Sequence, residues 1–526
     1  MRMKSDFVIL ASVVAVLLAS QAHATNVCDN CMYHVNESAG FCNWTAHLTA
    51  VPDCFPSNIT TLVLTGGNIK SLDNNSFARY PDLTAMRLQN NSITTIENQT
   101  FAKLAHLKLL DLSMNQLTSL DNTTFDDVSS TLTGLSLAHN RFPQLPEECL
   151  RPLVNLDELD LSFPNDEGGV KTAQLGPVFR NFAKLTILHV NGIGLTSLNN
   201  DTLATLNGSS LQSLKMDSNS LSTIERQSFA QLKLLQKLHL ANCSVNKIDQ
   251  SAFAELGQLY LLDLSQNDLE ESSFNGSVCA HLPMLSELMM DSYRGKTLPH
   301  IFTNCSALRN VSLALSSTLT SLGNSFNTSL ALQTLNLSHN AHLSITDAHA
   351  FNTSQIHILD LSASMTDDKM TSLPEAVRQI ANCSELWVVN ASFTTFSVED
   401  TIFFDSLVSL RAEGNPYSCE CDDPQFITWM QRSPSAISNV SHYDCAQCEG
   451  CDNTAPVMSF NFTECHAGAA PSCKLKDHAK LAAGLGVGGV VVGACVALLC
   501  VYIAFKKNCG CFKGVAYENM DRNENV

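Results

Sequence analysis

The sequence predicts a repeat solenoid, because one leucine pattern returns along most of the chain. Residues 107–120 read LKLLDLSMNQLTSL, which follows L-x-x-L-x-L-x-x-N-x-L, and most repeats of this pattern start about 24 residues apart. About fifteen coils fit between Ile59 and Leu407. A fixed period of this length is the signature of stacked units that bury their apolar faces against one another. Two observations complete the outline: clusters of cysteines flank the repeats, and a long uncharged apolar run follows them.

The composition limits the classes of partner. The 526 residues carry a formal net charge of −19, which disfavours a nucleic acid, because binding phosphate needs clustered Lys and Arg. Twenty cysteines indicate either metal sites or an oxidising compartment. The two ends of the chain favour the oxidising compartment.

Residues 1–24 have the pattern of a secretory signal peptide. Arg2 and Lys4 precede an apolar run, Phe7–Leu18, and residues 22–24 read AHA, a small-x-small cleavage site. An apolar run of about 12 residues is too short for a transmembrane helix. We therefore expect a mature chain that begins near Thr25 and folds where disulfides form.

Each repeat contains a change of period that has a physical reason. Its L-x-L segment fits a short strand whose leucines point inward. The chain then turns away from the sheet, where its backbone groups still need hydrogen bonds, and an asparagine amide supplies both donors and an acceptor. The asparagines at this position are Asn91, Asn115, Asn140, Asn219, Asn267, Asn340 and Asn415.

Phenylalanines recur as regularly as the asparagines. Six of them lie 18 positions after the opening residue of their repeat: Phe77, Phe101, Phe125, Phe229, Phe253 and Phe326. Because equivalent positions of neighbouring coils lie side by side, we expect these rings to stack as a row under the convex face.

In its pattern and period the chain resembles the extracellular leucine-rich-repeat family over residues 28–473. The resemblance implies an α/β repeat solenoid, a leucine-rich-repeat horseshoe with a parallel concave β-sheet, for residues 59–414. Residues 25–58 resemble the cysteine-rich N-terminal cap of this family, with Cys28, Cys31, Cys42 and Cys54.

The second cap is expected at residues 415–475. Residues 415–431, NPYSCECDDPQFITWMQ, are similar to the C-terminal flank of Toll-like receptors. That resemblance implies the pairs Cys419–Cys445 and Cys421–Cys465, although Cys448, Cys451 and Cys473 depart from the family pattern. The CxxC spacing in residues 445–451 would also suit zinc, but disulfides are the better reading outside the cell.

Four cysteines lie within the repeats at informative places. Cys279 and Cys305 each stand about 20 residues into their coils, one coil apart. Neighbouring coils stack about 5 Å apart at the sheet, so these Cα atoms fall within the reach of a disulfide. Cys149 and Cys243 are expected to be free and buried.

Glycosylation sequons occur about twenty times between Asn36 and Asn461 and are missing from the tail. Each occupied sequon needs a surface site in a secreted domain. The candidate glycosylation sites are Asn36, Asn43, Asn58, Asn98, Asn122, Asn310, Asn336, Asn352, Asn439 and Asn461. Asn310 and Asn336 fall at strand positions, so glycans on them would cover the C-terminal side of the concave sheet.

Residues 481–505 are expected to form one transmembrane helix. They carry no charge and reach roughly 37 Å as a helix, enough for a hydrocarbon core of about 30 Å. Lys506, Lys507 and Lys513 follow, which places that side in the cytoplasm and the N-terminus outside. Glycines at four-residue spacing would let two such helices pack closely and form a homodimer. The alternative is a glycine-rich helix that inserts into the membrane without pairing.

The cytoplasmic tail, residues 506–526, is too short for a folded domain and can act only through a linear motif. Residues 517–520 read YENM, and Tyr517 with Met520 resembles both an SH2-binding site and an endocytic adaptor signal. A solvated tail with a chance match is the alternative.

No motif of a known reaction is present. The sequence lacks GxSxG, HExxH and phosphate-loop patterns. We therefore expect no enzymatic activity and no cofactor.

The outward positions of the central coils are the candidate ligand-binding residues. They form a polar stripe of mixed charge on coils five to nine, and the alternative is an ordinary solvated surface. They are Asp160, His189, Asn191, Lys215, Asp217, His239 and Asp263.

The resemblance to Toll-like receptors implies a plasma-membrane receptor of innate immunity that binds an extracellular protein or glycan. The short tail leaves no room for the Toll/interleukin-receptor domain of that family, so a co-receptor, an adaptor-docking receptor or a decoy is expected. The rival interpretation is a cell-adhesion or matrix-organising leucine-rich-repeat protein with the same architecture.

Overall fold

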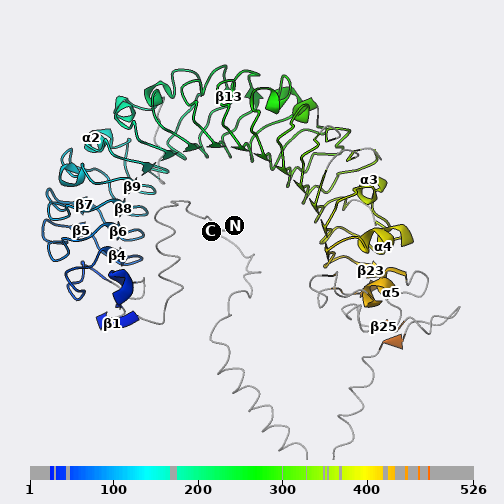
Figure 1. Cartoon of the computed structure of the whole chain (residues 1–526), viewed down its shortest axis with the longest axis horizontal. Coiled ribbons are helices and arrows are strands. Elements are labelled where there is room, and N and C mark those ends of the chain that lie inside the picture. The colour runs from blue at the N-terminus through cyan, green and yellow to red at the C-terminus, as the bar shows by residue number, and fades with distance from the viewer. Residues whose placement is uncertain are drawn as a thin grey trace, which may run out of the picture.

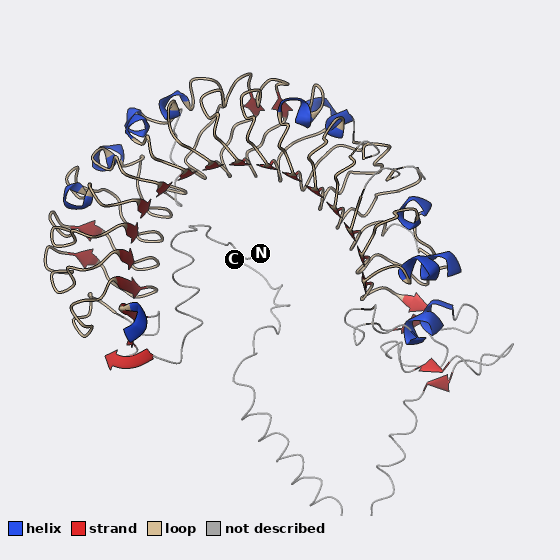
Figure 2. Ribbon diagram, viewed as in Figure 1, coloured by secondary structure: helices blue, strands red, loops and turns tan. Residues whose placement is uncertain are grey.

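The computed structural model shows a curved solenoid (Figure 1). It describes residues 24–28, 31–42, 48–165, 174–298, 300–326, 329–347, 350–351, 355–366 and 370–418, and then residues 425–432, 437, 443, 445–447, 460–461 and 472–473. The expected leucine-rich-repeat horseshoe is confirmed, because the strands line the inner curve and most short helices lie on the outer curve (Figure 2).

One 18-stranded sheet forms the concave face. From β4 onward its strands run parallel, and each begins two residues after a predicted opening position. These strands are β4 (Thr61–Leu64), β6 (Ala85–Arg87), β8 (Leu109–Asp111), β9 (Gly134–Ser136), β10 (Glu158–Asp160), β11 (Ile187–His189), β12 (Ser213–Lys215), β14 (Lys237–His239), β16 (Leu261–Asp263), β17 (Glu287–Met289), β18 (Asn310–Ser312), β19 (Thr334–Asn336), β20 (Ile358–Asp360), β21 (Glu385–Trp387) and β22 (Ser409–Arg411). The coil whose register is ambiguous in the sequence, near Cys383, is complete, because β21 pairs with both β20 and β22.

Short elements fill the outer curve. Two pairs of two-residue strands run there, β5 (Ser71–Leu72) with β7 (Thr95–Ile96) and β13 (Thr223–Ile224) with β15 (Lys247–Ile248). The helical turns are η4 (Asp126–Val128), α2 (Glu147–Leu150), η5 (Pro177–Asn181), η6 (Ala204–Leu206), η7 (Glu271–Ser273), η8 (Val278–His281), η9 (His300–Phe302), α3 (Glu375–Arg378) and α4 (Val398–Phe404).

An antiparallel segment covers the N-terminal end of the sheet. β2 (Cys31–His34) pairs with β1 (Ala24–Cys28) on one side and with β3 (Ala39–Cys42) on the other. The turn η2 (Val35–Glu37) connects β2 to β3, and β3 pairs in parallel with β4. A disulfide joins Cys31 to Cys42, whose Cα atoms are 4.3 Å apart. Leu62 and Leu64 of the first coil are thereby shielded from solvent.

Aromatic side chains close the C-terminal end. Phe396 packs against Phe404 and Phe426, and Tyr417 stacks on Tyr443 with ring centres 5.9 Å apart. The elements here are β23 (Tyr417–Ser418), α5 (Gln425–Arg432), β24 (Cys445–Gln447), β25 (Phe460–Asn461) and β26 (Ser472–Cys473). The expected partners Cys419, Cys421 and Cys465 lie outside the described residues.

The predicted role of the seven repeat asparagines, which we call the asparagine ladder, is confirmed. Asn267 shows its geometry. Its Oδ1 accepts the backbone N–H groups of Cys243 (3.0 Å) and Val245 (2.9 Å). Its Nδ2 donates to the carbonyls of Leu240 and Leu264, both at 2.8 Å. One buried side chain therefore satisfies backbone groups of two successive coils at the turn.

The phenylalanine row is confirmed where neighbouring coils both carry the ring. Phe101 stacks between Phe77 and Phe125 at centroid distances of 6.2 and 6.1 Å, and Phe229 stacks on Phe253 at 5.7 Å. All five rings are buried, so this row is the outer wall of the core.

Within the described part of the chain, no helix combines the length and the apolar character needed to cross a bilayer. Residues 1–23 of the expected signal peptide, the expected transmembrane segment 481–505 and the tail 506–526 lie outside the described residues.

Candidate ligand-binding surface

Parallel pairing brings five of the seven candidate residues into a single row. Asp160 lies opposite His189, His189 opposite Lys215, Lys215 opposite His239, and His239 opposite Asp263. Each residue is the last of its strand, so the row, which we call the concave row, crosses β10, β11, β12, β14 and β16. At about 4.8 Å per strand it is roughly 19 Å long.

The two ends of the concave row are acid–histidine pairs. His189 Nδ1 lies 3.8 Å from Asp160 Oδ2, and His239 Nδ1 lies 3.7 Å from Asp263 Oδ2. Burial raises the pKa of both carboxyls, but the contacts with the histidines and with nearby serines outweigh burial, so both pKa values lie below the ordinary value. The row therefore presents carboxylates at its ends and Lys215 at its centre.

The other two candidate residues, Asn191 and Asp217, hold the coils together. The N–H of Asp217 donates to Asn191 Oδ1 at 2.8 Å, and the N–H of Ala241 donates to Asp217 Oδ1 at 2.8 Å. Burial raises the pKa of Asp217. Both side chains lie just after their strands and are half-buried. Their hydrogen bonds stabilise the stacking of neighbouring coils, and a contact with a ligand would be a second role.

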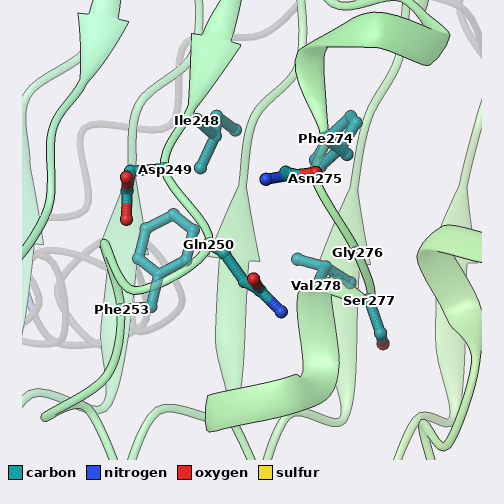
Figure 3. Close-up of a pocket in the computed structure, with 9 residues that line it drawn as sticks. All are labelled: Ile248, Asp249, Gln250, Phe253, Phe274, Asn275, Gly276, Ser277 and Val278. Carbon is teal, nitrogen blue, oxygen red and sulfur yellow. The ribbon is translucent and has the colours of Figure 1, made fainter.

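The side chains of the concave row are largely covered by their neighbours. His189 has only 7 % of its side chain exposed, and Asp160 has 16 %. The pocket in Figure 3 lies away from the concave row, between Ile248, Phe253 and Phe274, and holds about 20 Å³, room for about one water molecule.

No group of His, Cys, Asp and Glu among the described residues could hold a metal ion. The free cysteines of the described chain, Cys149, Cys243 and Cys383, are buried, as expected for the first two. Burial raises the pKa of each thiol to about 12, so these thiols stay protonated and unreactive at neutral pH.

Sequence reasoning missed a cation–π pair at the C-terminal end of the sheet. Trp387 is the last residue of β21, and the Arg411 guanidinium lies over its ring at 5.0 Å. Arg411 also pairs with Glu413 at 3.2 Å. The repeat register near Cys383 is ambiguous in the sequence, so the outward position of Trp387 could not be assigned there.

The described sequons differ in exposure. Asn36, Asn58, Asn98, Asn122 and Asn310 are exposed. Asn336 is half-buried, and its Nδ2 donates to Ser312 Oγ at 3.1 Å. The side chains of Asn43, Asn352, Asn439 and Asn461 lie outside the described part.

Comparison with known families agrees with this geometry. The family described as Leucine rich repeat matches residues 57–117, 106–166, 183–245 and 234–292. The BspA type Leucine rich repeat region matches residues 296–407. The chain belongs to the leucine-rich-repeat proteins.

Individual relatives of this leucine-rich-repeat protein are distant. Tsukushi of Gallus gallus is 28% identical over 185 residues, which are 32% of this chain and 50% of that protein, so the chain spans about half of its length. A leucine-rich-repeat protein of Leptospira interrogans shares the fold with a TM-score of 0.50 and 21% identity, over 70% of this chain and 85% of the other. The mouse RP105/MD-1 complex contains a chain with a TM-score of 0.50 and 15% identity, over 79% and 81%.

Proposed function

We propose that this leucine-rich-repeat protein is a single-pass receptor of the plasma membrane whose concave row binds an extracellular protein or glycan. The observation that supports this proposal is the alignment of Asp160, His189, Lys215, His239 and Asp263 on one face of a rigid sheet. A preorganised row of opposite charges favours orientation and specificity of a complementary surface.

The domain layout belongs to the same proposal. It has a signal peptide at 1–24, caps at 25–58 and 415–475, repeats at 59–414, a membrane helix at 481–505 and a cytoplasmic tail at 506–526. The RP105/MD-1 structure, by its title, is a complex of two proteins, and it supports a protein partner or a co-receptor role for this chain. The role in innate immune recognition is proposed on the resemblance of the sequence to Toll-like receptors.

The experiment starts from a screen of secreted and cell-surface proteins and of glycans with the soluble fragment 25–475. For any ligand found, Lys215→Glu and Asp263→Lys are expected to weaken binding, because each reverses a charge in the concave row. Lys233→Glu is the matched control, since Lys233 is exposed outside the sheet and pairs with Glu255 at 3.6 Å. Affinity that changes as much with the control as with Lys215→Glu would move the site elsewhere.

The tail has its own role in this proposal. Tyr517 is expected to recruit SH2 proteins when phosphorylated and endocytic adaptors when not. Tyr517→Phe should abolish both; uptake and recruitment equal to the unchanged chain would reduce the tail to an anchor.

A further inference from the structure

Three sequons of this chain contain a cysteine between the asparagine and the serine. They are Asn242-Cys243-Ser244, Asn304-Cys305-Ser306 and Asn382-Cys383-Ser384. In all three the asparagine is exposed and the cysteine is buried, so the folded surfaces are alike. The cysteines differ in their bonding: Cys243 and Cys383 are free thiols, whereas Cys305 is bonded to Cys279.

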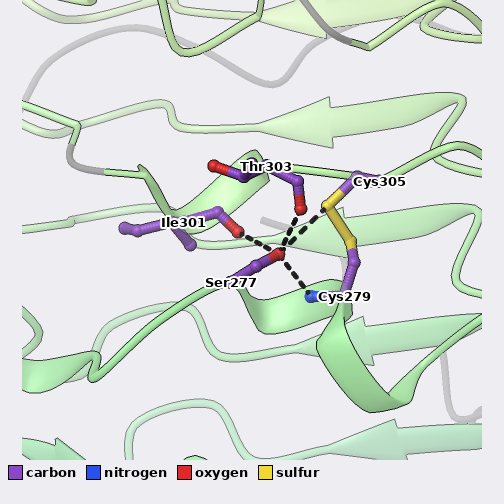
Figure 4. The surroundings of a disulfide bond; sticks show 5 residues. All are labelled: Ser277, Cys279, Ile301, Thr303 and Cys305. Atoms are coloured by element: carbon purple, nitrogen blue, oxygen red, sulfur yellow. Dashed lines mark hydrogen bonds between the residues drawn. A yellow bond between two sulfur atoms is a disulfide. The ribbon is translucent and has the colours of Figure 1, made fainter.

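The bond to Cys279 fixes the residue directly after Asn304, and hydrogen bonds of Ser277 hold the residues before it. Figure 4 shows Ser277 beside the disulfide, with its hydroxyl directed at the Ile301 and Thr303 carbonyls at 3.1 and 2.6 Å. The same oxygen accepts the Cys279 N–H at 3.1 Å and lies 4.0 Å from Cys305 Sγ. Asn304 is therefore flanked by two ties to the previous coil: hydrogen bonds on the segment before it and the disulfide on the residue after it.

We propose that Asn304 is an N-glycosylation site that is open only while Cys279 and Cys305 are still thiols. An oligosaccharide transferase must take hold of the chain on both sides of the acceptor asparagine. Once the disulfide forms, Cys305 next to Asn304 is covalently joined to the segment around Cys279. This second segment blocks the enzyme from binding the chain on that side of Asn304. The inference rests on the proposed passage of this chain through the secretory pathway.

Two reactions compete for the same segment. In glycosylation, Asn304 Nδ2 forms a bond to the anomeric carbon of a lipid-pyrophosphate-linked oligosaccharide. The bond from that carbon to the pyrophosphate oxygen breaks, and the amide gives up one proton. In closure, the two thiols pass two electrons and two protons to the disulfide of a thiol oxidoreductase, which leaves as a dithiol. The relative rates of these two reactions set the occupancy of Asn304.

The test is glycopeptide mass spectrometry on the full chain made in cultured animal cells, with the intracellular pool included so that secretion is not required. In the unchanged chain, Asn304 is expected to have lower occupancy than Asn242 and Asn382. Cys279→Ser keeps the sequon but removes the bond, and it should raise Asn304 to the level of the other two. Cys243→Ser, which removes a free thiol from the matched sequon, should leave Asn242 unchanged.

The controls separate the possible failures. If Asn98 and Asn122 carry no glycan, the chain does not pass through the secretory pathway and the proposed function fails. If they are glycosylated and Asn304 has the same occupancy with and without Cys279, the gating is overturned. It is also overturned if Cys279→Ser raises Asn242, Asn304 and Asn382 in parallel, because slow folding alone would do that.

Discussion

At the scale of the residue, two aspartates on neighbouring coils, Asp263 and Asp291, have pKa values shifted in opposite directions. Asp263 faces His239, and the pKa of Asp263 falls although burial raises it. Asp291 accepts hydrogen bonds from Ser312 and the N–H of Ala314, but burial and the charge of Asp263 leave its pKa raised. An ionised Asp263 therefore stabilises the fold, and an ionised Asp291 opposes it.

Asparagine substitutions test this difference. Asp263→Asn is expected to lower the urea midpoint of the soluble fragment at pH 7.5. A carboxyl whose pKa is lowered in the folded state stabilises the fold at every pH above its pKa in the unfolded chain, and the variant loses this stabilisation. That loss shrinks as the pH falls through the folded pKa of Asp263. Asp291→Asn keeps the Oδ1 acceptor and is expected to raise the midpoint at pH 7.5, with the gain disappearing below the unfolded pKa. Midpoints that shift in the same direction for both variants would contradict the assignment.

At the scale of the element, one residue in the left-handed backbone conformation follows each parallel strand and starts the turn of the coil. The eighth position of each repeat has a positive φ, from Gly66 at 73° to Gly414 at 74°. Its N–H bonds to the next coil, as when Met114 donates to the carbonyl of Ala138 at 2.8 Å. Met114 and Phe163 adopt this conformation with φ of 56° and 48°, which large side chains rarely do.

Gly192 is the eighth residue of its coil and tests the turn. Its φ is 60°, and an added Cβ would lie 2.4 Å from Cδ1 of Phe163, whose ring stacks on His139. Gly192→Ala is expected to cost about 1–3 kcal/mol in overpacking beyond the left-handed strain. Gly208→Ala is the matched control, since its φ is 84° and nothing lies within 4 Å. Equal melting temperatures for the two variants would mean that the Phe163 ring moves aside at no cost.

The leucine spacing predicted the strands, the asparagine ladder and the phenylalanine row, because each follows from the side-chain type at a fixed position. The concave row could also be placed, since parallel strands in register align equal positions. The left-handed turn could not be found, because residues as different as Met114, His139 and Gly192 occupy it. The burial of His189 also escaped prediction, because it depends on contacts with the neighbouring strands.

At the scale of the whole molecule, the chain is a stack in which each coil touches mainly its neighbours. Among the described strands β14 pairs with β12 and β16, and β15 pairs with β13 while its Ile248 forms a bridge to Phe274, so the coil of residues 235–258 is held by the coils on both sides of it. Stability in such a stack is close to a sum of coil and interface contributions. The turn bonds differ between the two interfaces: Asn267 accepts the Val245 N–H at 2.9 Å from the following coil, whereas Cys243 takes the asparagine position toward the preceding coil and its Sγ lies 3.2 Å from the Met216 carbonyl.

Removing a whole coil should therefore be tolerated better than removing half of one. Deletion of residues 235–258 leaves β12 to pair with β16 in the same register, with Lys215 opposite Asp263 and Asn267 able to accept from the backbone of the preceding coil. The soluble fragment is expected to be secreted and to melt cooperatively, at a lower temperature because Phe229 loses its stacking partner Phe253. Deletion of residues 235–246 shifts the leucine pattern against the sheet and should abolish secretion. If both deletions were secreted equally, the coil would not be the unit of this fold. If neither were secreted, the coils would depend on one another beyond their nearest neighbours.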